Sequence, residues 1–81
     1  MTVRVLLFAV LRDAAGAGEV TLEFSAGTTA RVAAEELAAR FPAIKTYLPR
    51  VALAVNQEYV PGETQLNDGD ELALIPPVSG G

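Results

Sequence analysis

The 81-residue sequence contains no cysteine and no histidine. Without thiols the chain can form no disulfide, hold no iron–sulfur cluster and offer no thiolate nucleophile. Without imidazoles it lacks the side chain most often used for proton transfer near neutral pH, and it lacks the usual nitrogen ligand of zinc. The chain is therefore a poor candidate for a self-sufficient enzyme, and we expect it to bind no metal ion and no cofactor itself.

Basic residues are scarce as well. Lys45 and five arginines stand against ten acidic residues, which gives a net charge of -4. The sequence has no basic stretch of the kind that binds nucleic acid, so we expect no nucleic-acid partner. Lys45 is a single amine with no neighbour in the sequence that would favour loss of its proton, which favours a surface role over Schiff-base chemistry.

Long apolar runs are also missing. No segment approaches the roughly 20 apolar residues that a membrane span needs. The opening stretch "MTVRVLLFAVLRD" reaches charged residues, and no small-residue cleavage pattern follows them. We therefore expect a mature, cytoplasmic chain with no membrane partner.

What is present is the composition of one globular domain, with 51% hydrophobic and 20% charged residues. Alternating apolar residues predict strands over residues 3–10 and 19–24, and the glycines of "RDAAGAGE" between them predict a hairpin. The two sides of the first strand are expected to carry, respectively, Val3, Val5 and Leu7, and Arg4, Leu6 and Phe8.

The stretch "ARVAAEELAARF" over residues 30–41 is rich in helix formers and predicts the main helix, with Thr28 or Thr29 as its N-cap. Pro42 ends this helix because the residue before a proline disfavours helical geometry. Residues 43–49, "AIKTYLP", are ambiguous and are compatible with a short helical turn over an edge of the core. The apolar face of the helix is expected to carry Ala30, Ala33, Ala34, Leu37 and Phe41.

Three further strands are predicted, separated by turns with Pro-Gly and Asp-Gly pairs. They cover residues 51–56, 58–60 and 72–75. The order strand, strand, helix, strand, short strand, strand predicts an α+β fold, in which one main helix lies across one face of a mixed sheet of about five strands. This is the β-grasp, or ubiquitin-like, architecture.

We expect the domain to occupy residues 1–75 and an extended tail to occupy residues 76–81. The β-grasp scaffold hosts ferredoxins, RNA-binding modules, protein modifiers and sulfur carriers, so the fold alone does not define a function. The missing cysteines exclude the ferredoxins, and the missing basic patch weighs against RNA.

Three stretches resemble one family in particular. "LLFAVLRDAAG", "AVNQEYV" and "LNDGDELALIPPVSGG" together resemble the small subunit of molybdopterin synthase, a sulfur carrier of molybdenum cofactor biosynthesis. The resemblance runs from the first strand to the last residue, with the segments in the family's order. The main helix matches by pattern more than by identity, and a terminal Gly-Gly alone is shared by many modifiers.

The resemblance implies a chemistry at the C-terminus. In this family the terminal glycine carboxylate, here Gly81, is adenylated with ATP by an activating enzyme and converted to a thiocarboxylate. Its sulfur is then given to cyclic pyranopterin monophosphate held in the large subunit. The implied partners are the large subunit, the ATP-dependent adenylating enzyme and a sulfurtransferase as sulfur source. Catalytic side chains are expected on the large subunit, and the family implies a heterotetramer.

The end of the chain suits this role. Six extended residues reach roughly 20 Å, which would carry Gly81 into another protein's pocket. The prolines hold the exit extended, and glycine allows close approach to adenylate and phosphate groups. The residues expected to thread the partner's active site are Pro76, Pro77, Val78, Ser79 and Gly80.

A docking surface is expected on the sheet face opposite the main helix. The alternation places there four residues, Leu6, Phe8, Ala73 and Ile75. An apolar patch of this kind marks a protein contact. The alternative is that the "AIKTYLP" segment covers part of it. Arg12 and Asp13 belong to a family-like stretch, but a solvated charge pair explains them equally well.

Two alternative functions stay open. One is the sulfur carrier of thiamin thiazole synthesis, although those chains tend to be shorter and lack the "FAVLRDAAG" and "PPVSGG" stretches. The other is a ubiquitin-like modifier whose Gly81 is joined to lysines of target proteins. This last role shares the activation step and is compatible with the first.

Overall fold

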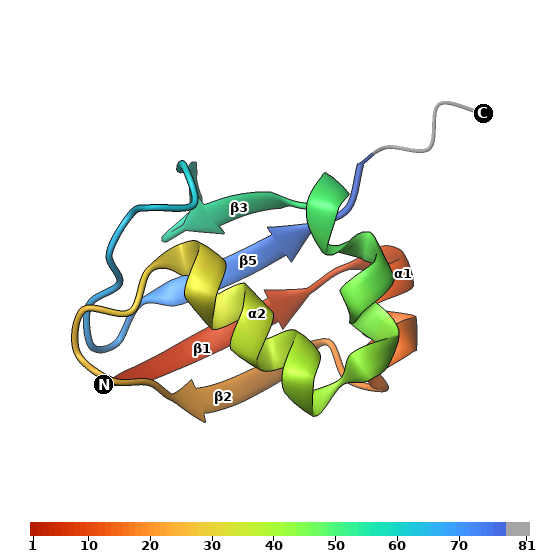
Figure 1. The fold of residues 1–81 in the computed structure, drawn as a ribbon, viewed down its shortest axis with the longest axis horizontal. Helices are drawn as coiled ribbons and strands as arrows, with labels where there is room; N and C mark the ends of the chain where they lie inside the picture. Colours follow the sequence, from red (N-terminus) through yellow and green to blue (C-terminus); the bar gives the residue numbers. More distant parts are fainter. Residues whose placement is uncertain (78–81) are drawn as a thin grey trace.

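The computed structural model describes residues 1–77, and residues 78–81 lie outside the described part. Five strands form one sheet in the order β2-β1-β5-β3-β4, in which β1 and β5 are parallel and the other neighbours antiparallel. The elements are, in chain order, β1 (Thr2–Leu7), α1 (Ala9–Ala15), β2 (Glu19–Glu23), α2 (Ala30–Arg40), the 3-10 helix η1 (Pro42–Arg50), β3 (Ala52–Val55), β4 (Glu58–Tyr59) and β5 (Glu71–Ile75). Figure 1 shows α2 lying across one face of this mixed sheet, so the predicted α+β, β-grasp architecture is confirmed.

The core lies between α2 and the central strands. Val5 of β1 is paired with Leu72 of β5, and both side chains are fully buried. On α2 the buried positions are mostly alanines around a fully buried Leu37, and these small side chains let the helix axis lie close to the sheet. The helix begins as predicted, because Thr29 Oγ1 accepts a hydrogen bond of 3.2 Å from the Val32 N–H.

The first strand and its hairpin were predicted incorrectly. Strand β1 ends at Leu7, and α1 fills the stretch expected to finish the strand and turn. Leu11 of α1 is fully buried, so packing against the core favours a helix in a stretch whose apolar run fits either structure. Gly16 ends α1 in a left-handed conformation, with φ 76°. Strands β1 and β2 still pair antiparallel, but a helix joins them.

The ambiguous "AIKTYLP" segment forms the central part of η1. Pro42 stands at the start of this helix, and Ile44 is fully buried in the core, with Tyr47 and Leu48 partly buried around it. Because η1 contacts α2 and α1, it lies on the helix side of the sheet. The alternative in which this segment covers the opposite face is therefore wrong.

The buried carboxylate of Asp70 links the residues around the start of β5 to the β3–β4 turn by hydrogen bonds. Asp70 accepts hydrogen bonds from Asn56 Nδ2 at 3.0 Å and from the Asn67 N–H at 2.7 Å. The Asn56 side chain in turn accepts a bond of 3.0 Å from the Glu71 N–H. These bonds fasten the β3–β4 turn to the start of β5. They therefore help to set the register of the strand that leads to the C-terminal tail.

The β3–β4 turn carries a conformational cost that a substitution can remove. Asn56 and Gln57, between the paired Val55 and Glu58, both have positive φ, at 51° and 72°. Such two-residue turns favour Asn-Gly, because a residue with a Cβ pays for this conformation and glycine does not. We expect Gln57→Gly to raise the free energy of unfolding by about 1 kcal/mol in urea denaturation. Gln57→Ala is the control, and an equal gain from alanine would contradict this explanation.

Candidate functional site

The last strand delivers the C-terminal tail from the centre of the sheet. Strand β5 lies between β1 and β3 and ends at Ile75, which is paired with Ala52. Pro76 follows half-buried and Pro77 exposed. The expected reactive residue Gly81 and the expected tail residues Val78, Ser79 and Gly80 lie outside the described residues.

The parallel pairing of β1 with β5 brings the end of the first strand beside the start of the tail. Leu7 is the register partner of Leu74, so Phe8 follows next to the position of Ile75. Phe8 has extended φ and ψ of -117° and 152°, and its side chain is 44% exposed. An exposed phenylalanine therefore lies at the end of β1, next to the end of β5 from which the tail leaves.

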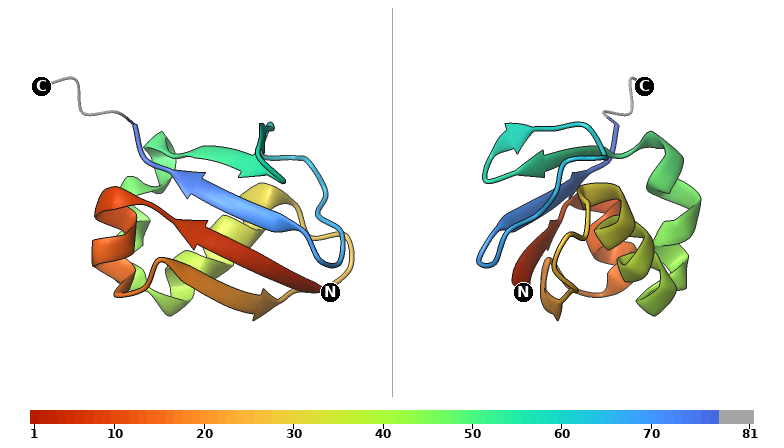
Figure 2. Two further views of the ribbon diagram at one scale, coloured as in Figure 1. Left: turned by 180° about the vertical axis from the view of Figure 1, so that it is seen from behind. Right: turned by 60° about the vertical axis from the view of Figure 1, so that its left-hand side comes forward.

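Three of the four predicted docking residues come from neighbouring strands on one face. Leu6 is paired with Ala73, and the alternation of β5 places Ile75 on the same side. Leu6 and Ile75 are half-buried, whereas Ala73 is only 7% exposed and forms the floor of the patch. No helix covers this side of the sheet in the left view of Figure 2.

Sequence reasoning missed residues that extend this face toward the other edge of the sheet. Ala54 is paired with both Ala73 and Tyr59, and the Tyr59 side chain is 72% exposed. A two-residue strand is too short for the alternation of its residues to show which face of the sheet each side chain lies on. The pairing of Tyr59 with Ala54 of β3 places the tyrosine on the same face as Ala54. We call the open face the surface formed by Leu6, Phe8, Ala52, Ala54, Tyr59, Ala73 and Ile75.

This side of the sheet is polar at one end of the strands and apolar at the other. At the end where β1 and β5 begin, Arg4 and Glu71 form an ion pair of 2.7 Å, and Thr2 is hydrogen bonded to Glu23. The apolar residues gather at the other end, where β5 leads into Pro76. A partner that recognises apolar surface would therefore sit over the base of the tail.

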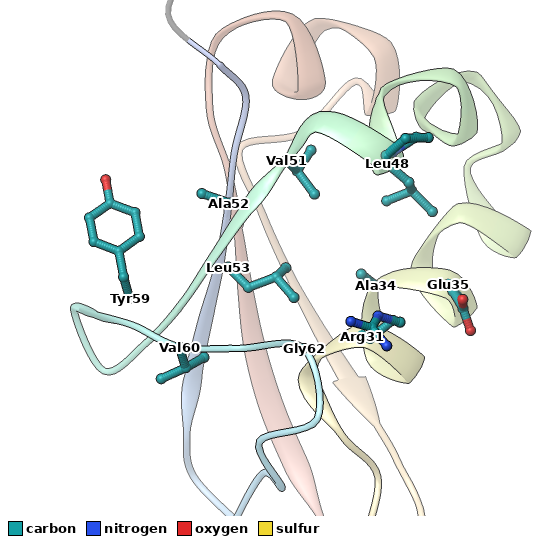
Figure 3. A pocket seen from close by; sticks show the side chains of 11 residues that line it. Arg31, Ala34, Glu35, Leu48, Val51, Ala52, Leu53, Tyr59, Val60 and Gly62 are labelled. Carbon is teal, nitrogen blue, oxygen red and sulfur yellow. The ribbon is translucent and has the colours of Figure 1, made fainter.

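A second surface feature adjoins the open face at Ala52 and Tyr59, which belong to both. A groove of about 610 Å³ runs between α2 and the edge of β3, and Figure 3 shows Leu53 pointing toward Ala34 of α2 while Tyr59 points away. Arg31 and Glu35 line the groove, and an added Cβ at Gly62 would come within 2.7 Å of the Arg31 guanidinium. The lining includes neither a nucleophile nor any predicted site residue.

Within the part of the chain that the structure describes, no group of three or more acidic side chains could hold a metal ion. Among the same residues, no helix has the length and apolar character to cross a membrane.

Arg12 and Asp13 lie exposed on α1, and the Arg12 methylenes would be 3.1 Å from a Cβ added at Gly18.

A β-grasp domain with an open apolar face at the base of a Gly-Gly tail belongs to the class of ubiquitin-like carrier domains. Comparison with known proteins is more specific: the chain belongs to the ThiS family, which it matches over residues 5–81. It is 40% identical to the molybdopterin synthase sulfur carrier subunit of Chlamydomonas reinhardtii over 100% of both chains. It is 39% identical to the protein of that description in Arabidopsis thaliana, over 98% of this chain and 82% of the relative.

Solved structures agree on the fold. SAMP1, a small archaeal modifier protein from Haloferax volcanii, superimposes with a TM-score of 0.91 at 29% identity, over 100% of both chains. A structure described as a protein–protein complex of subunits 1 and 2 of molybdopterin-converting factor from Helicobacter pylori contains a chain with a TM-score of 0.71 at 24% identity, again over 100% of both chains. At that identity the second likeness concerns the fold alone.

Proposed function

We propose that this chain is the sulfur carrier subunit of a molybdopterin synthase and that it donates sulfur from its C-terminus to cyclic pyranopterin monophosphate. The observation that carries this proposal is the similarity, over the whole chain, to curated relatives described as molybdopterin synthase sulfur carrier subunits. The absence of cysteine and histidine from the sequence supports it, because the terminal carboxylate is then the most suitable reactive group.

The chemistry begins with a poor electrophile. A C-terminal carboxyl is ionised at neutral pH, with a typical pKa of about 3.5, and an anion resists nucleophilic attack. In the proposed sequence the Gly81 carboxylate attacks the α-phosphorus of ATP, pyrophosphate leaves, and an acyl adenylate forms. Hydrosulfide, or its equivalent delivered by the sulfur source, then displaces AMP, and the resulting thiocarboxylate is the sulfur donor. ATP is used by the activating enzyme and is not held by this chain.

Three partners follow from this proposal: the large subunit, the adenylating enzyme and a sulfurtransferase that supplies sulfur. We propose that the large subunit docks on the open face, provides the catalytic side chains and forms a heterotetramer with this chain in the cytoplasm. The open face includes Ile75, and Pro76 of the tail follows directly. This position supports the arrangement, because docking on the open face would bring the tail to the partner's pocket. The Helicobacter pylori complex described above is a precedent for such pairing.

The proposal is tested by intact-mass analysis of the chain isolated from cells. We expect an oxygen-to-sulfur exchange at Gly81, which incubation with the large subunit and the pyranopterin precursor discharges as the dithiolene forms. A thiamin-type carrier would show the exchange without that discharge. Absence of any exchange, or a glycyl-lysine adduct as the sole product, would refute the proposal.

The docking surface can be tested by placing a charge on it. We expect Phe8→Asp to weaken binding to the large subunit by at least about tenfold, because an exposed aromatic anchor is replaced by a carboxylate that must be desolvated. The control is Val32→Asp on α2, since Val32 is 42% exposed and Phe8 44%. Isothermal titration calorimetry measures both variants. Equal weakening by the two substitutions would show that the open face is not the docking surface.

A role as a protein modifier is the second candidate function. The structural likeness to SAMP1 favours it, because that protein is described as a modifier. Both functions use an activated Gly81, so they are compatible in one chain. A glycyl-lysine linkage between Gly81 and other cellular proteins, found by tandem mass spectrometry, would establish this second role.

A further inference from the structure

We propose that Lys45 is the acceptor at which this protein modifies itself, by forming an amide between the activated Gly81 and the Lys45 amine. This inference rests on the proposed activation of Gly81 and adds a modification site to it. Two sources of the acyl group share this chemistry, namely the chain's own tail and the tail of a second copy.

The chain has few amines that could accept an acyl group. Lys45 is the single lysine of the sequence, and the five arginines are not acylated under such conditions because their guanidinium groups stay protonated. The other amine is that of Met1. It donates a hydrogen bond of 2.8 Å to the Phe24 carbonyl oxygen, and the Met1 residue packs against the core.

The fold reverses the usual order of reactivity of these two amines. An α-amino group loses its proton at lower pH than a lysine, so in an unfolded chain near neutral pH it is the better nucleophile. In the folded chain the Met1 amine is partly buried and tethered by its hydrogen bond to Phe24, which hinders its approach to an acyl carbon, whereas Lys45 is exposed. The structure therefore directs acylation to Lys45.

Lys45 is exposed on the surface of η1. Its backbone is fixed by the neighbouring Ile44, which is fully buried. Lys45 lines a surface hollow of about 660 Å³ between α2 and η1, whose wall includes the small residues Ala38 and Ala39. Small walls leave room for a glycine backbone to approach the amine.

Lys45 lies on the helix side of the sheet. Because η1 contacts α2 and α1, a partner bound on the open face would leave Lys45 uncovered. Self-modification would then not compete directly with docking. It would instead consume the reactive Gly81 carboxyl whenever sulfur is not supplied.

The step balances without a redox partner. The neutral Nζ of Lys45 attacks the acyl carbon of activated Gly81, and a C–N bond forms. The bond from the acyl carbon to its leaving group breaks, and the leaving group departs with the electron pair. That group is AMP for the adenylate and a thiolate for a thioester. The amine gives up one proton to the solvent.

The test uses the full chain with a Gly81 thioester produced by intein thiolysis, so no activating enzyme is needed. Trypsin cleaves after Arg40 and Arg50 and finds no basic residue in the sequence from 51 to 81. Tandem mass spectrometry should therefore find peptide 41–50 joined through Lys45 to peptide 51–81. A product of two chains identifies a second copy as the acyl source, and a cyclised single chain identifies the chain's own tail.

Two variants and one condition decide the outcome. Lys45→Arg should abolish the branched peptide, and N-terminal acetylation should leave its yield unchanged. In urea we expect the product to shift toward Met1, because unfolding releases the α-amine. Hydrolysis alone, acylation of Met1 in the folded chain, or the same ratio of sites with and without urea would overturn the proposal. Since the thioester bypasses ATP-dependent activation, these results are independent of whether sulfur exchange occurs in cells.

Discussion

Deletion of Gly81 is expected to abolish sulfur transfer to the pyranopterin precursor, while the free energy of unfolding changes by less than about 0.5 kcal/mol. The proposed chemistry requires a terminal glycine carboxylate to be adenylated and thiolated, and the shortened chain would end one residue too early to place that atom. The buried core runs from Val3 to Leu74, so the deletion removes no core residue. Formation of molybdopterin by the reconstituted synthase measures transfer, and urea denaturation measures stability.

The matched control lengthens the tail instead of shortening it. An alanine added after Gly81 keeps every native residue but replaces the free carboxylate by a peptide bond, so we expect transfer to be lost again. Wild-type transfer by either variant would show that the Gly81 carboxylate is not the sulfur donor. A marked loss of stability on deletion would instead show that the tail contributes to the packing of the domain.

Among the substitutions proposed for this protein, Ile44→Ala is expected to lower the free energy of unfolding most. Ile44 is fully buried although it belongs to a 3-10 helix, and truncation of a buried isoleucine to alanine costs about 2–5 kcal/mol. That range is a large part of the roughly 5–15 kcal/mol that stabilise a small domain. We expect the urea midpoint to fall steeply, with little change in the denaturant slope.

Lys45→Ala is the control, because it changes the next residue of the same helix at an exposed position. We expect this variant to stay within about 0.5 kcal/mol of the parent. Similar losses from both substitutions would mean that η1 is sensitive as a whole and that Ile44 is not a specific core contact. A loss below about 1 kcal/mol from Ile44→Ala would place this residue outside the core.

Local chemistry was sufficient to predict α2 and most of the strands. Thr29 offers a capping oxygen, the alanines favour a helix, and Pro42 prevents its continuation, so all the signals lie within a few residues of the helix ends. The alternation of Val3, Val5 and Leu7 likewise identifies the buried side of β1 without knowledge of its neighbours. Such elements are predictable because their propensity and their final packing agree.

Local chemistry was insufficient for α1, η1 and the far part of the open face. The run from Phe8 to Leu11 fits a strand or a helix equally well, and the burial of Leu11 in the core as part of α1 decides between them. The direction in which η1 packs is set by the burial of Ile44 in the core. Tyr59 joins the open face through its pairing with Ala54, and that pairing joins β4 to the rest of the sheet.

The sequence by itself determined the reactive inventory of this protein: no thiol, no imidazole, one lysine and a Gly-Gly terminus. It also determined the periodicity from which the β-grasp architecture follows. Only the tertiary structure decided which residues share a surface. The parallel pairing of β1 with β5 joins segments more than 60 residues apart and sets Phe8 at the base of the tail. Contacts of that kind depend on which distant segments bury apolar area together, and no local pattern of residues encodes that choice.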